Sequence, residues 1–289
     1  MTVQYLGVII EPGKTSLSPV FQQAAVDALG LEYRYEQWPT PPDGLATRVT
    51  GMRAPSVRGA NVTIPHKETI IPLLDGIDDV ARQVGALNTV RNDGGRLTGF
   101  NTDVAGFTRA LREDGTFDPA GAQVVVVGAG GSARAVIIAL ASAGVASIAI
   151  FARTRLRADR LVAEVRPYSG TVSLQALGDG PSAVAEVMAS ATLLVNCTPL
   201  GTAGTPEERL SPVPAATIHR QMLVFDLVYR PTVTPLLRDA AARGALTLGG
   251  LPMLIYQGAA SFKIWTGQDA PVDVMFLAAR EELAKEGPA

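Results

Sequence analysis

The chain has 289 residues, of which 47% are hydrophobic and 18% charged, and its formal net charge is −2. This length and composition predict a globular protein of about two domains. The near-neutral charge, without any run of Lys or Arg, argues against nucleic acid or membrane partners and favours a small-molecule substrate. Because the single cysteine excludes an intramolecular disulfide and the first residues lack the pattern of a signal peptide, we expect a cytoplasmic protein.

The first hundred residues alternate short apolar strands with amphipathic helices, which is an α/β pattern. Helices are expected to start at Pro19, Leu45 and Pro65 and near Asp78. Strands are expected at 3–10, 33–38, 59–63, 87–92 and 95–100.

From Gln123 the alternation becomes stricter and has the order of a doubly wound nucleotide-binding sheet. The expected elements are a strand at 123–127, a helix at 131–143, a strand at 147–151, a helix from Leu156, and strands at 192–195 and 222–227. Residues 124–151 are apolar enough to suggest a membrane helix as an alternative. Arg134 and the glycine-rich break favour strand, turn, helix and strand instead.

The last forty residues contain two expected helices, 251–267 and 271–286, with no strand between them. We expect these helices to pack back on the N-terminal region. The predicted architecture is therefore a discontinuous α/β substrate domain, 1–103 plus 251–289, and a Rossmann-type dinucleotide-binding domain, 104–250.

A glycine-rich turn follows the strand at 123–127 and precedes a helix, the context of a dinucleotide-binding motif. Its backbone N–H groups would contact a pyrophosphate, and the candidate cofactor-binding residues are Gly128, Ala129, Gly130, Gly131 and Ser132. The alternative is a purely structural turn without a ligand.

The end of the next strand lacks the acidic residue that binds the ribose of NAD. Arginines follow instead, and a guanidinium suits the 2′-phosphate of NADP. The candidates are Arg153, Thr154 and Arg157, whereas Arg155 is expected to be a surface residue. The alternative is a solvated, arginine-rich start of a helix.

Ser16 and Ser18 lie two residues apart ahead of a helix, so their hydroxyls could together bind a substrate carboxylate. The structural alternative is that Ser18 is the N-cap and Pro19 the first helical residue, a common helix start.

Polar residues interrupt apolar strands in "NVTIPHKE", "GALNTV" and "GFNTDVAGF". Such side chains line a wet site or form a buried network, and each alone is more readily structural. Pro65 is expected to start a helix with Lys67 in its first turn. Only four of the 25 basic residues are lysines, which suggests that Lys67 is used for its exchangeable proton.

Nine motifs in this order resemble the shikimate dehydrogenase family. They are "SLSP", "NVTIPHKE", "GALNTV", "GFNTDVAGF", "GAGGSARA", "ART", "NCTPLG", "FDLVYRPTVTPLL" and "GLPMLIYQGAASF". The resemblance runs from about residue 5 to residue 267.

The resemblance implies an NADP-dependent shikimate dehydrogenase of aromatic amino-acid biosynthesis, with Lys67 and Asp103 as the catalytic pair. The implied substrate-binding residues are Ser16, Ser18, Asn61, Thr63, Asn88, Tyr229 and Gln257. Positions near the nicotinamide half match Thr198, Leu227, Gly250 and Met253.

Two departures qualify this match. Ala152 stands where NADP-using members have asparagine, so one amide contact to the ribose is missing. Thr15 replaces a histidine ahead of the serine pair, where little effect on the chemistry is expected. Ser18 favours shikimate over quinate, because quinate-using relatives often have threonine at that position.

The alternatives are a paralogue that uses quinate, an aminoshikimate or NAD, and a cofactor-binding regulator without turnover. No metal site is expected, because His66 and His219 are too few and too scattered. No redox role is expected for Cys197, which lacks a basic partner. The oligomeric state is expected to be monomer or homodimer.

Overall fold

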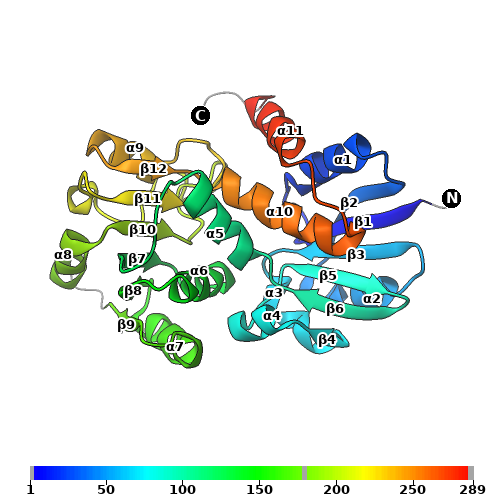
Figure 1. Cartoon of the computed structure of the whole chain (residues 1–289), viewed down its shortest axis with the longest axis horizontal. Coiled ribbons are helices and arrows are strands. Elements are labelled where there is room, and N and C mark those ends of the chain that lie inside the picture. The colour runs from blue at the N-terminus through cyan, green and yellow to red at the C-terminus, as the bar shows by residue number, and fades with distance from the viewer. Residues whose placement is uncertain (1–2, 178–180, 286–289) are drawn as a thin grey trace. The chain divides into compact units, whose positions relative to one another are not determined.

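The computed structural model describes residues 3–177 and 181–285, and it divides the chain into two compact units. One unit takes in Met1–Gly106 and Ile255–Gly287 and the other is Phe107–Leu254, each as far as the chain is described. Each unit contains one six-stranded sheet (Figure 1). No helix in the described ranges is long and apolar enough to cross a membrane.

The sheet of the first unit is mixed. Its strands, in spatial order, are β2 (Tyr33–Pro39), β1 (Gln4–Ile10), β3 (Val57–Val62), β5 (Thr89–Asp93), β6 (Arg96–Phe100) and β4 (Gly76–Ile77). β1 runs parallel to β2 and β3, and β5 runs antiparallel to β3 and β6. The apolar run of β1 is buried along its C-terminal five residues, as expected for a central parallel strand.

Helices cover this sheet and include the two C-terminal ones. They are α1 (Ser18–Ala28), α2 (Leu45–Gly51), α3 (His66–Thr69), α4 (Asp79–Val84), α10 (Leu251–Thr266, from Ile255 on in this unit) and α11 (Val272–Lys285), with 3-10 turns at Pro42–Gly44 and Ile71–Leu73. α11 packs against α1 (Figure 1). The expectation that the C-terminal helices pack back on the first domain is confirmed.

Trp265 fixes α10 against β3 and β5. Its indole Nε1–H donates to the carbonyl oxygen of Val90 at 2.9 Å. A Cβ on Gly59 would lie 2.4 Å from that Nε1 and 2.3 Å from the same carbonyl oxygen, so only glycine leaves room for the ring. This contact holds α10 over the strands that carry the candidate site.

The sheet of the second unit is wholly parallel. Its strands, in spatial order, are β12 (Leu246–Leu248), β11 (Leu223–Asp226), β10 (Leu193–Asn196), β7 (Gln123–Val127), β8 (Ser147–Phe151) and β9 (Ser173–Ala176). This is the doubly wound order, which reverses between β7 and β10. Ligands bind beyond the carboxyl ends of the strands at such a reversal.

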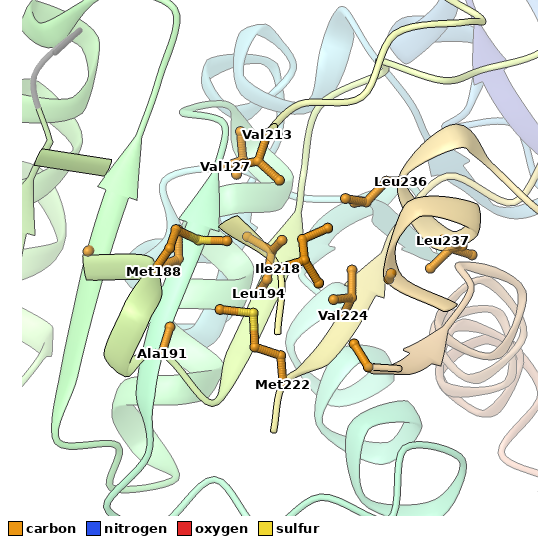
Figure 2. Close-up of a cluster of buried hydrophobic side chains, with 14 of the residues drawn as sticks. Val127, Met188, Ala191, Leu194, Val213, Ile218, Met222, Val224, Leu236 and Leu237 are labelled. Atoms are coloured by element: carbon orange, nitrogen blue, oxygen red, sulfur yellow. The ribbon is translucent and has the colours of Figure 1, made fainter. Parts of the chain in front are cut away.

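The helices of this unit are α6 (Gly131–Ser142), α7 (Arg155–Val165), α8 (Pro181–Ser190) and α9 (Pro235–Ala242), with 3-10 turns at Arg166–Tyr168 and Ala215–Thr217. Figure 2 shows Leu194 and Val224 of the central strands packed with Met188 of α8 and Leu236 of α9. This apolar core fixes β10 and β11 and therefore the loops that follow them.

The predicted fold class is confirmed, whereas several elements were missed. Helix α5 (Asp103–Glu113), strands β4, β9 and β12, and helices α8 and α9 were not expected. Residues 124–151 fold as strand, helix and strand, as expected.

Candidate functional site

Lys67 and Asp103 form an ion pair in the first unit. The Nζ atom of Lys67 lies 2.6 Å from Oδ2 of Asp103, and their side chains are 16% and 7% exposed. Lys67 belongs to α3 and Asp103 is the first residue of α5. The fold thus places in contact two residues that are 36 positions apart in the sequence. A charged hydrogen bond of this length in a largely buried place holds the ammonium group in one position.

Two hydrogen bonds to carbonyl oxygens fix the helix that contains Lys67. The Nε2 atom of His66 lies 2.8 Å from the carbonyl oxygen of Thr40, and Leu87 N–H donates to the Lys67 carbonyl at 2.9 Å. His66 is buried and anchors α3. The helix begins at His66, so the expectation that Pro65 is its first residue is wrong by one position. Pro65 has no N–H to donate and occupies the N-cap instead.

Asn88 connects Asp103 to the C-terminal helix. Its Nδ2 atom lies 2.8 Å from Oδ1 of Asp103 and 3.0 Å from Oε1 of Gln257. Its Oδ1 atom accepts from the backbone N–H of Thr102 at 2.8 Å. Asp103 is therefore held by Lys67 on one oxygen and by Asn88 on the other, which favours this orientation of the carboxylate.

A cluster of buried hydroxyl groups, which sequence reasoning missed, lies beside Asn88. Ser261 Oγ lies 2.7 Å from Oγ1 of Thr89 and 3.1 Å from Oγ1 of Thr102. Thr89 directly follows Asn88, and Thr102 directly precedes Asp103. Ser261 is one helical turn after Gln257. That adjacency was the signal that could have found them.

The two serines lie together at the start of α1. Ser16 Oγ is 3.1 Å from Ser18 Oγ and accepts the backbone N–H of Ser18 at 3.1 Å. The structural alternative for Ser18 is wrong, because Leu17 occupies the N-cap with helical φ and ψ and no side chain caps the helix. Ser18 is the first helical residue, and its hydroxyl is available for another partner.

Asn61 is buried and its amide group is fully engaged. Its Nδ2 atom lies 3.0 Å from Ser261 Oγ and 3.1 Å from the Asn88 carbonyl oxygen. Its Oδ1 accepts from the hydroxyl of Tyr35 at 2.7 Å. Thr63, by contrast, is half-buried just beyond β3, and its hydroxyl donates to the neighbouring carbonyl oxygen of Ile64 at 3.2 Å.

Hydrogen bonds connect five of the candidates in the first unit, Asn61, Lys67, Asn88, Asp103 and Gln257, whereas Ser16, Ser18 and Thr63 lie in the same unit without a direct hydrogen bond to these five. Ser16, Ser18, Asn61, Thr63, Lys67, Asn88, Asp103 and Gln257 come from β3, the loops beside it and the starts or turns of α1, α3, α5 and α10. Tyr229 belongs to the second unit, where the Arg230 guanidinium lies 6.0 Å from its ring centroid.

In the second unit, Gly128 follows β7 at the point where the strand order reverses. Its φ is +117°, and a Cβ there would lie 3.2 Å from the carbonyl carbon of Cys197 and be strained. Gly130 is the N-cap of α6 without a side-chain cap, and among the described residues no neighbouring atom would come within 4 Å of a Cβ added to it. The space above this turn is therefore open.

The first turn of α6 directs backbone donors toward that space. Gly131, Ser132 and Ala133 precede the first intrahelical bond, which Arg134 N–H donates to the Gly130 carbonyl at 3.0 Å. Because α6 is 12 residues long, its N-terminus carries a substantial positive dipole end. A pyrophosphate group fits this turn. Ala129, which is half-buried, lies in the turn between Gly128 and Gly130.

A buried carboxylate organises the loops after β10 and β11. Asp226 is paired in register with Asn196, accepts from its Nδ2 at 2.9 Å and from the hydroxyl of Thr234 at 2.6 Å. Asn196 Oδ1 then accepts both the N–H and the hydroxyl of Thr198, at 3.0 and 2.7 Å. Burial raises the pKa of the Asp226 carboxyl, against the opposing effect of its hydrogen bonds.

The remaining nicotinamide-side candidates lie at the same edge of the sheet. Leu227 N–H donates to the Asn196 carbonyl at 3.0 Å, and Gly250 N–H donates to the Val228 carbonyl at 3.2 Å. A Cβ on Gly250 would lie 2.1 Å from the Leu227 carbonyl oxygen, so this position requires glycine. Met253 is buried in the first turn of α10.

The arginines lie between β8 and α7. Arg153, Thr154 and Arg157 are exposed, with Thr154 at the N-cap of α7. Arg155 donates to both carboxylate oxygens of Asp159 at 2.9 and 3.1 Å, which agrees with its expected surface role. Arg153 and Arg157 are thus the cations that could reach a 2′-phosphate beyond the end of β8.

Two further expectations concern groups outside these sites. Burial raises the pKa of the Cys197 thiol, so the reactive thiolate is disfavoured. Within the described ranges, no cluster of three or more His, Cys, Asp or Glu side chains could hold a metal ion.

Three family models match parts of this chain. Residues 8–90 match a model of the shikimate dehydrogenase substrate binding domain, 111–240 a shikimate / quinate 5-dehydrogenase model, and 250–275 a shikimate 5′-dehydrogenase C-terminal domain model. Shikimate dehydrogenase (NADP(+)) of Methanopyrus kandleri is 44% identical, over 96% of this chain and 95% of that protein.

Two solved structures extend the match. The Thermus thermophilus shikimate 5-dehydrogenase in complex with NADP(H) and shikimate has a TM-score of 0.85 and 38% identity, covering 96% of this chain and 99% of that one. The quinate dehydrogenase of Corynebacterium glutamicum in complex with NAD has a TM-score of 0.88 and 31% identity, covering 97% and 100%. The chain belongs to the shikimate dehydrogenase family.

Proposed function

We propose that this protein is an NADP-dependent shikimate dehydrogenase, which reversibly reduces 3-dehydroshikimate to shikimate in aromatic amino-acid biosynthesis. The observation that carries the proposal is the contact of 2.6 Å between Lys67 and Asp103. A lysine held by a carboxylate, among side chains that can bind hydroxyl and carboxylate groups, suits proton transfer to a ring oxygen. The relatives named above support the choice of substrate and cofactor.

The two units divide the work. The first unit is the substrate-binding and catalytic domain, for which 1–103 plus 251–289 are the boundaries proposed from the sequence. The second, 104–250, is the dinucleotide-binding domain. The open turn at Gly130 and the start of α6 support this division, because they fit a pyrophosphate.

NADPH, when bound, supplies the hydride for the ring carbonyl. Gly128, Gly130 and the first turn of α6 would hold its pyrophosphate, and Arg153 with Arg157 would bind the 2′-phosphate through charge-assisted bonds. Thr198, Leu227, Gly250 and Met253 would lie on the nicotinamide side. These assignments rest on the residues present at the carboxyl edge of the parallel sheet.

Lys67 supplies the proton. In the reductive direction its ammonium group donates to the oxygen that becomes the hydroxyl, and in the oxidative direction its amine accepts that proton. Asp103 holds the ammonium group, and Asn88 holds Asp103 in turn. Arginine at position 67 could hold a charge but could not exchange the proton.

Substrate recognition uses the serine pair for the carboxylate. Thr63, Asn88 and Gln257 would bind ring hydroxyls, together with Tyr229 of the second unit. Ser18 favours shikimate over quinate, because quinate-using relatives often have threonine at this position, and the discrimination that one methyl group provides is modest.

One solved neighbour, the quinate dehydrogenase in complex with NAD, has a different activity, but the NADP-dependent relatives do not favour that activity here. A paralogue that uses quinate, an aminoshikimate or NAD is therefore the less favoured alternative. A regulator without turnover is disfavoured by the intact pair of Lys67 and Asp103. Cytoplasmic location and a monomer or homodimer stay predictions.

Absorbance at 340 nm separates these functions, with shikimate or quinate as substrate and NADP⁺ or NAD⁺ as cofactor. We expect the cofactor to be reduced fastest when shikimate is paired with NADP⁺. A preference for quinate or NAD⁺ would establish the paralogue. NADPH binding without absorbance change in any pair would establish the regulator.

A further inference from the structure

Asn196 and Asp226 form a fully buried pair in the second unit, and the proposed proton transfer makes no use of it. Both residues are 0% exposed, and they lie in register at the ends of the neighbouring strands β10 and β11. Asp226 Oδ1 accepts from Nδ2 of Asn196 at 2.9 Å and from the backbone N–H of Val228 at 3.1 Å. Its Oδ2 accepts from the hydroxyl of Thr234 at 2.6 Å. Both oxygens of this buried carboxyl group are therefore engaged.

These contacts fix the orientation of the Asn196 amide. Its Oδ1 accepts from the backbone N–H of Thr198 at 3.0 Å, while its Nδ2 faces the Asp226 carboxyl group. Turning the amide over would place its NH2 group against the Thr198 N–H and its carbonyl oxygen against Asp226. Both contacts would be repulsive, and polar groups without a partner are costly at this depth. The positions of the amide oxygen and nitrogen therefore follow from their partners.

The orientation of Asn196 decides what the Thr198 hydroxyl can do. Thr198 Oγ1 lies 2.7 Å from Oδ1 of Asn196, which is a carbonyl oxygen and can only accept. The hydroxyl must therefore donate its single proton to Asn196. Its oxygen also accepts the backbone N–H of Leu200 at 3.3 Å. A hydroxyl oxygen has two lone pairs, so one of them remains for a further donor, and no proton remains for a further acceptor.

Thr198 lies where a ligand of this sheet is expected. It is half-buried and follows β10, next to the point at which the strand order reverses. Cys197 N–H donates to the Val127 carbonyl at 2.8 Å, which ties the loop after β10 to the glycine turn that follows β7. The nicotinamide half of NADP carries hydrogen-bond donors, namely the amino group of its carboxamide and the hydroxyls of its ribose. A donor of this kind suits an oxygen that can only accept.

We propose that Asn196, held by Asp226, is a positioning residue that presets the Thr198 hydroxyl as a hydrogen-bond acceptor for a donor group on the nicotinamide half of the cofactor. The inference rests on the proposed function, because it assumes that the parallel sheet binds NADP. Asn196 and Asp226 are too enclosed to touch the cofactor and act through Thr198. An acceptor that is already oriented meets its donor without a further cost of ordering.

Removal of the Thr198 oxygen should weaken only the nicotinamide side. Thr198→Val keeps the shape of the side chain, and we expect the Kd for NADP⁺ to rise ~10-fold by calorimetry, the effect of one lost hydrogen bond. Adenosine 2′,5′-bisphosphate has no nicotinamide, so its affinity should not change. Thr198→Ser keeps the hydroxyl and should bind both ligands as wild type does. Thr198→Ala removes the same oxygen with less volume and replaces the valine variant if that variant does not fold.

Thr192→Val is the matched control. Thr192 directly precedes β10 at the opposite end of the strand, is half-buried, and its hydroxyl donates to the carbonyl oxygen of Gln123 at 3.4 Å. The change of residue type is the same, but it lies away from the carboxyl edge of the sheet. This variant should bind NADP⁺ and the bisphosphate as wild type does.

Two further variants test whether Asn196 acts through Thr198. Asn196→Ala removes the acceptor of the Thr198 proton, so NADP⁺ should bind more weakly and the bisphosphate equally well. Added to Thr198→Val, it should weaken NADP⁺ binding less than the product of the two single losses. Asp226→Asn keeps a carbonyl oxygen for Nδ2 of Asn196, so its affinity for NADP⁺ should stay near that of wild type. Multiplicative losses, or a loss in Asp226→Asn as large as that in Thr198→Val, would contradict the link.

An analogue of the cofactor identifies the donor. In 3-acetylpyridine adenine dinucleotide phosphate, a methyl group replaces the amino group of the carboxamide. If that amino group is the donor, wild type and Thr198→Val bind the analogue equally. If a ribose hydroxyl is the donor, Thr198→Val binds the analogue ~10-fold more weakly than wild type does.

Two results for Thr198→Val would overturn the proposal. The first is an unchanged affinity for NADP⁺ in the folded variant. The second is an equal loss of affinity for NADP⁺ and for the bisphosphate, which would indicate a general change in the second unit. Wild type that binds neither ligand would instead contradict the proposed function.

Discussion

The two candidate sites are built in different ways. In the first unit the site consists of side chains bonded to one another, from the Lys67–Asp103 pair through Asn88 to Ser261. In the second unit it consists mainly of backbone, with glycines where a side chain would not fit and one buried carboxylate beneath. A site made of side chains is disabled when one functional group is changed. A site made of backbone is disabled when a side chain is added to one of its glycines. Substitutions of each kind can therefore test this difference.

The largest effect is expected for Asp103→Asn, which keeps the size of the side chain and removes the charge that holds Lys67. General acid–base groups contribute ~10²–10⁴-fold, so kcat should fall by at least ~10²-fold. Asp269→Asn is the matched control, because Asp269 lies 2.6 Å from Lys263 in an exposed pair of the same unit. Steady-state absorbance assays measure both. Equal kcat in the two variants would remove Asp103 from the chemistry.

Two glycine substitutions should separate ligand contact from folding. Gly130 has φ −103° and open space around it, so Gly130→Ala should fold normally and bind NADPH ~10-fold more weakly by fluorescence titration. Gly250→Ala places a Cβ 2.1 Å from a carbonyl oxygen. It should lower the thermal unfolding midpoint by roughly 5–10 °C, since such overpacking costs ~1–3 kcal/mol. Loss of stability in Gly130→Ala would contradict the open turn.

A smaller effect is expected from the arginines. Arg153→Ala should reduce the preference for NADP⁺ over NAD⁺ in kcat/KM by ~10-fold, because one charge-assisted contact to the 2′-phosphate is lost. Arg155 is engaged by Asp159, so Arg155→Ala should leave the preference unchanged. If Arg153→Ala and Arg155→Ala show the same preference for NADP⁺ over NAD⁺, the proposed position of the 2′-phosphate is wrong.

The smallest effect concerns pH. Burial raises the pKa of Asp226 above its ordinary value of 3.8, so the folded protein keeps this proton to a higher pH than the unfolded chain does. The stability that this proton contributes is present below about pH 4 and is lost as pH rises through the folded pKa. The thermal midpoint of wild type relative to Asp226→Asn should therefore fall as the pH is raised above 4. A relative midpoint that rises with pH would show a lowered pKa.

The elements with strong local signals were predictable from the sequence. Buried apolar strands such as β1 and β7 stand out by composition, and the glycine turn after β7 stands out by context. β9 and β12 have only four and three residues and carry exposed side chains, so no apolar run marks them. Short edge strands of this kind are defined by their partners, not by their own residues.

Helix α5 was missed for a different reason. Gly106 in its first turn disfavours a helix locally. A Cβ there would lie 2.7 Å from the Cβ of Gln257, so the glycine is required by a close helix–helix contact that the sequence does not show. The N-cap at Ser18 was predicted wrongly for a similar reason: local preference favoured serine, and the chain placed Leu17 there.

The glycine turn, the arginines and the serine pair were candidates from the residues themselves, whereas the pairing of Lys67 with Asp103 was implied only by the resemblance to a family. The structure places these two side chains 2.6 Å apart. Tyr35, Thr89 and Ser261 match no motif of their own, because a hydroxyl group in a strand or helix is ordinarily structural. Only the three-dimensional network gives them a role.

Proton transfer by Lys67 is the central claim, and Lys67→Arg tests it most directly. Lys263→Arg is the control, since Lys263 also pairs with an aspartate but is exposed. Turnover of shikimate with NADP⁺ is followed at 340 nm, with folding and NADPH binding confirmed for both variants. We expect a loss of ~10²-fold or more for Lys67→Arg and none for Lys263→Arg. Near-normal turnover in a folded Lys67→Arg would contradict the claim.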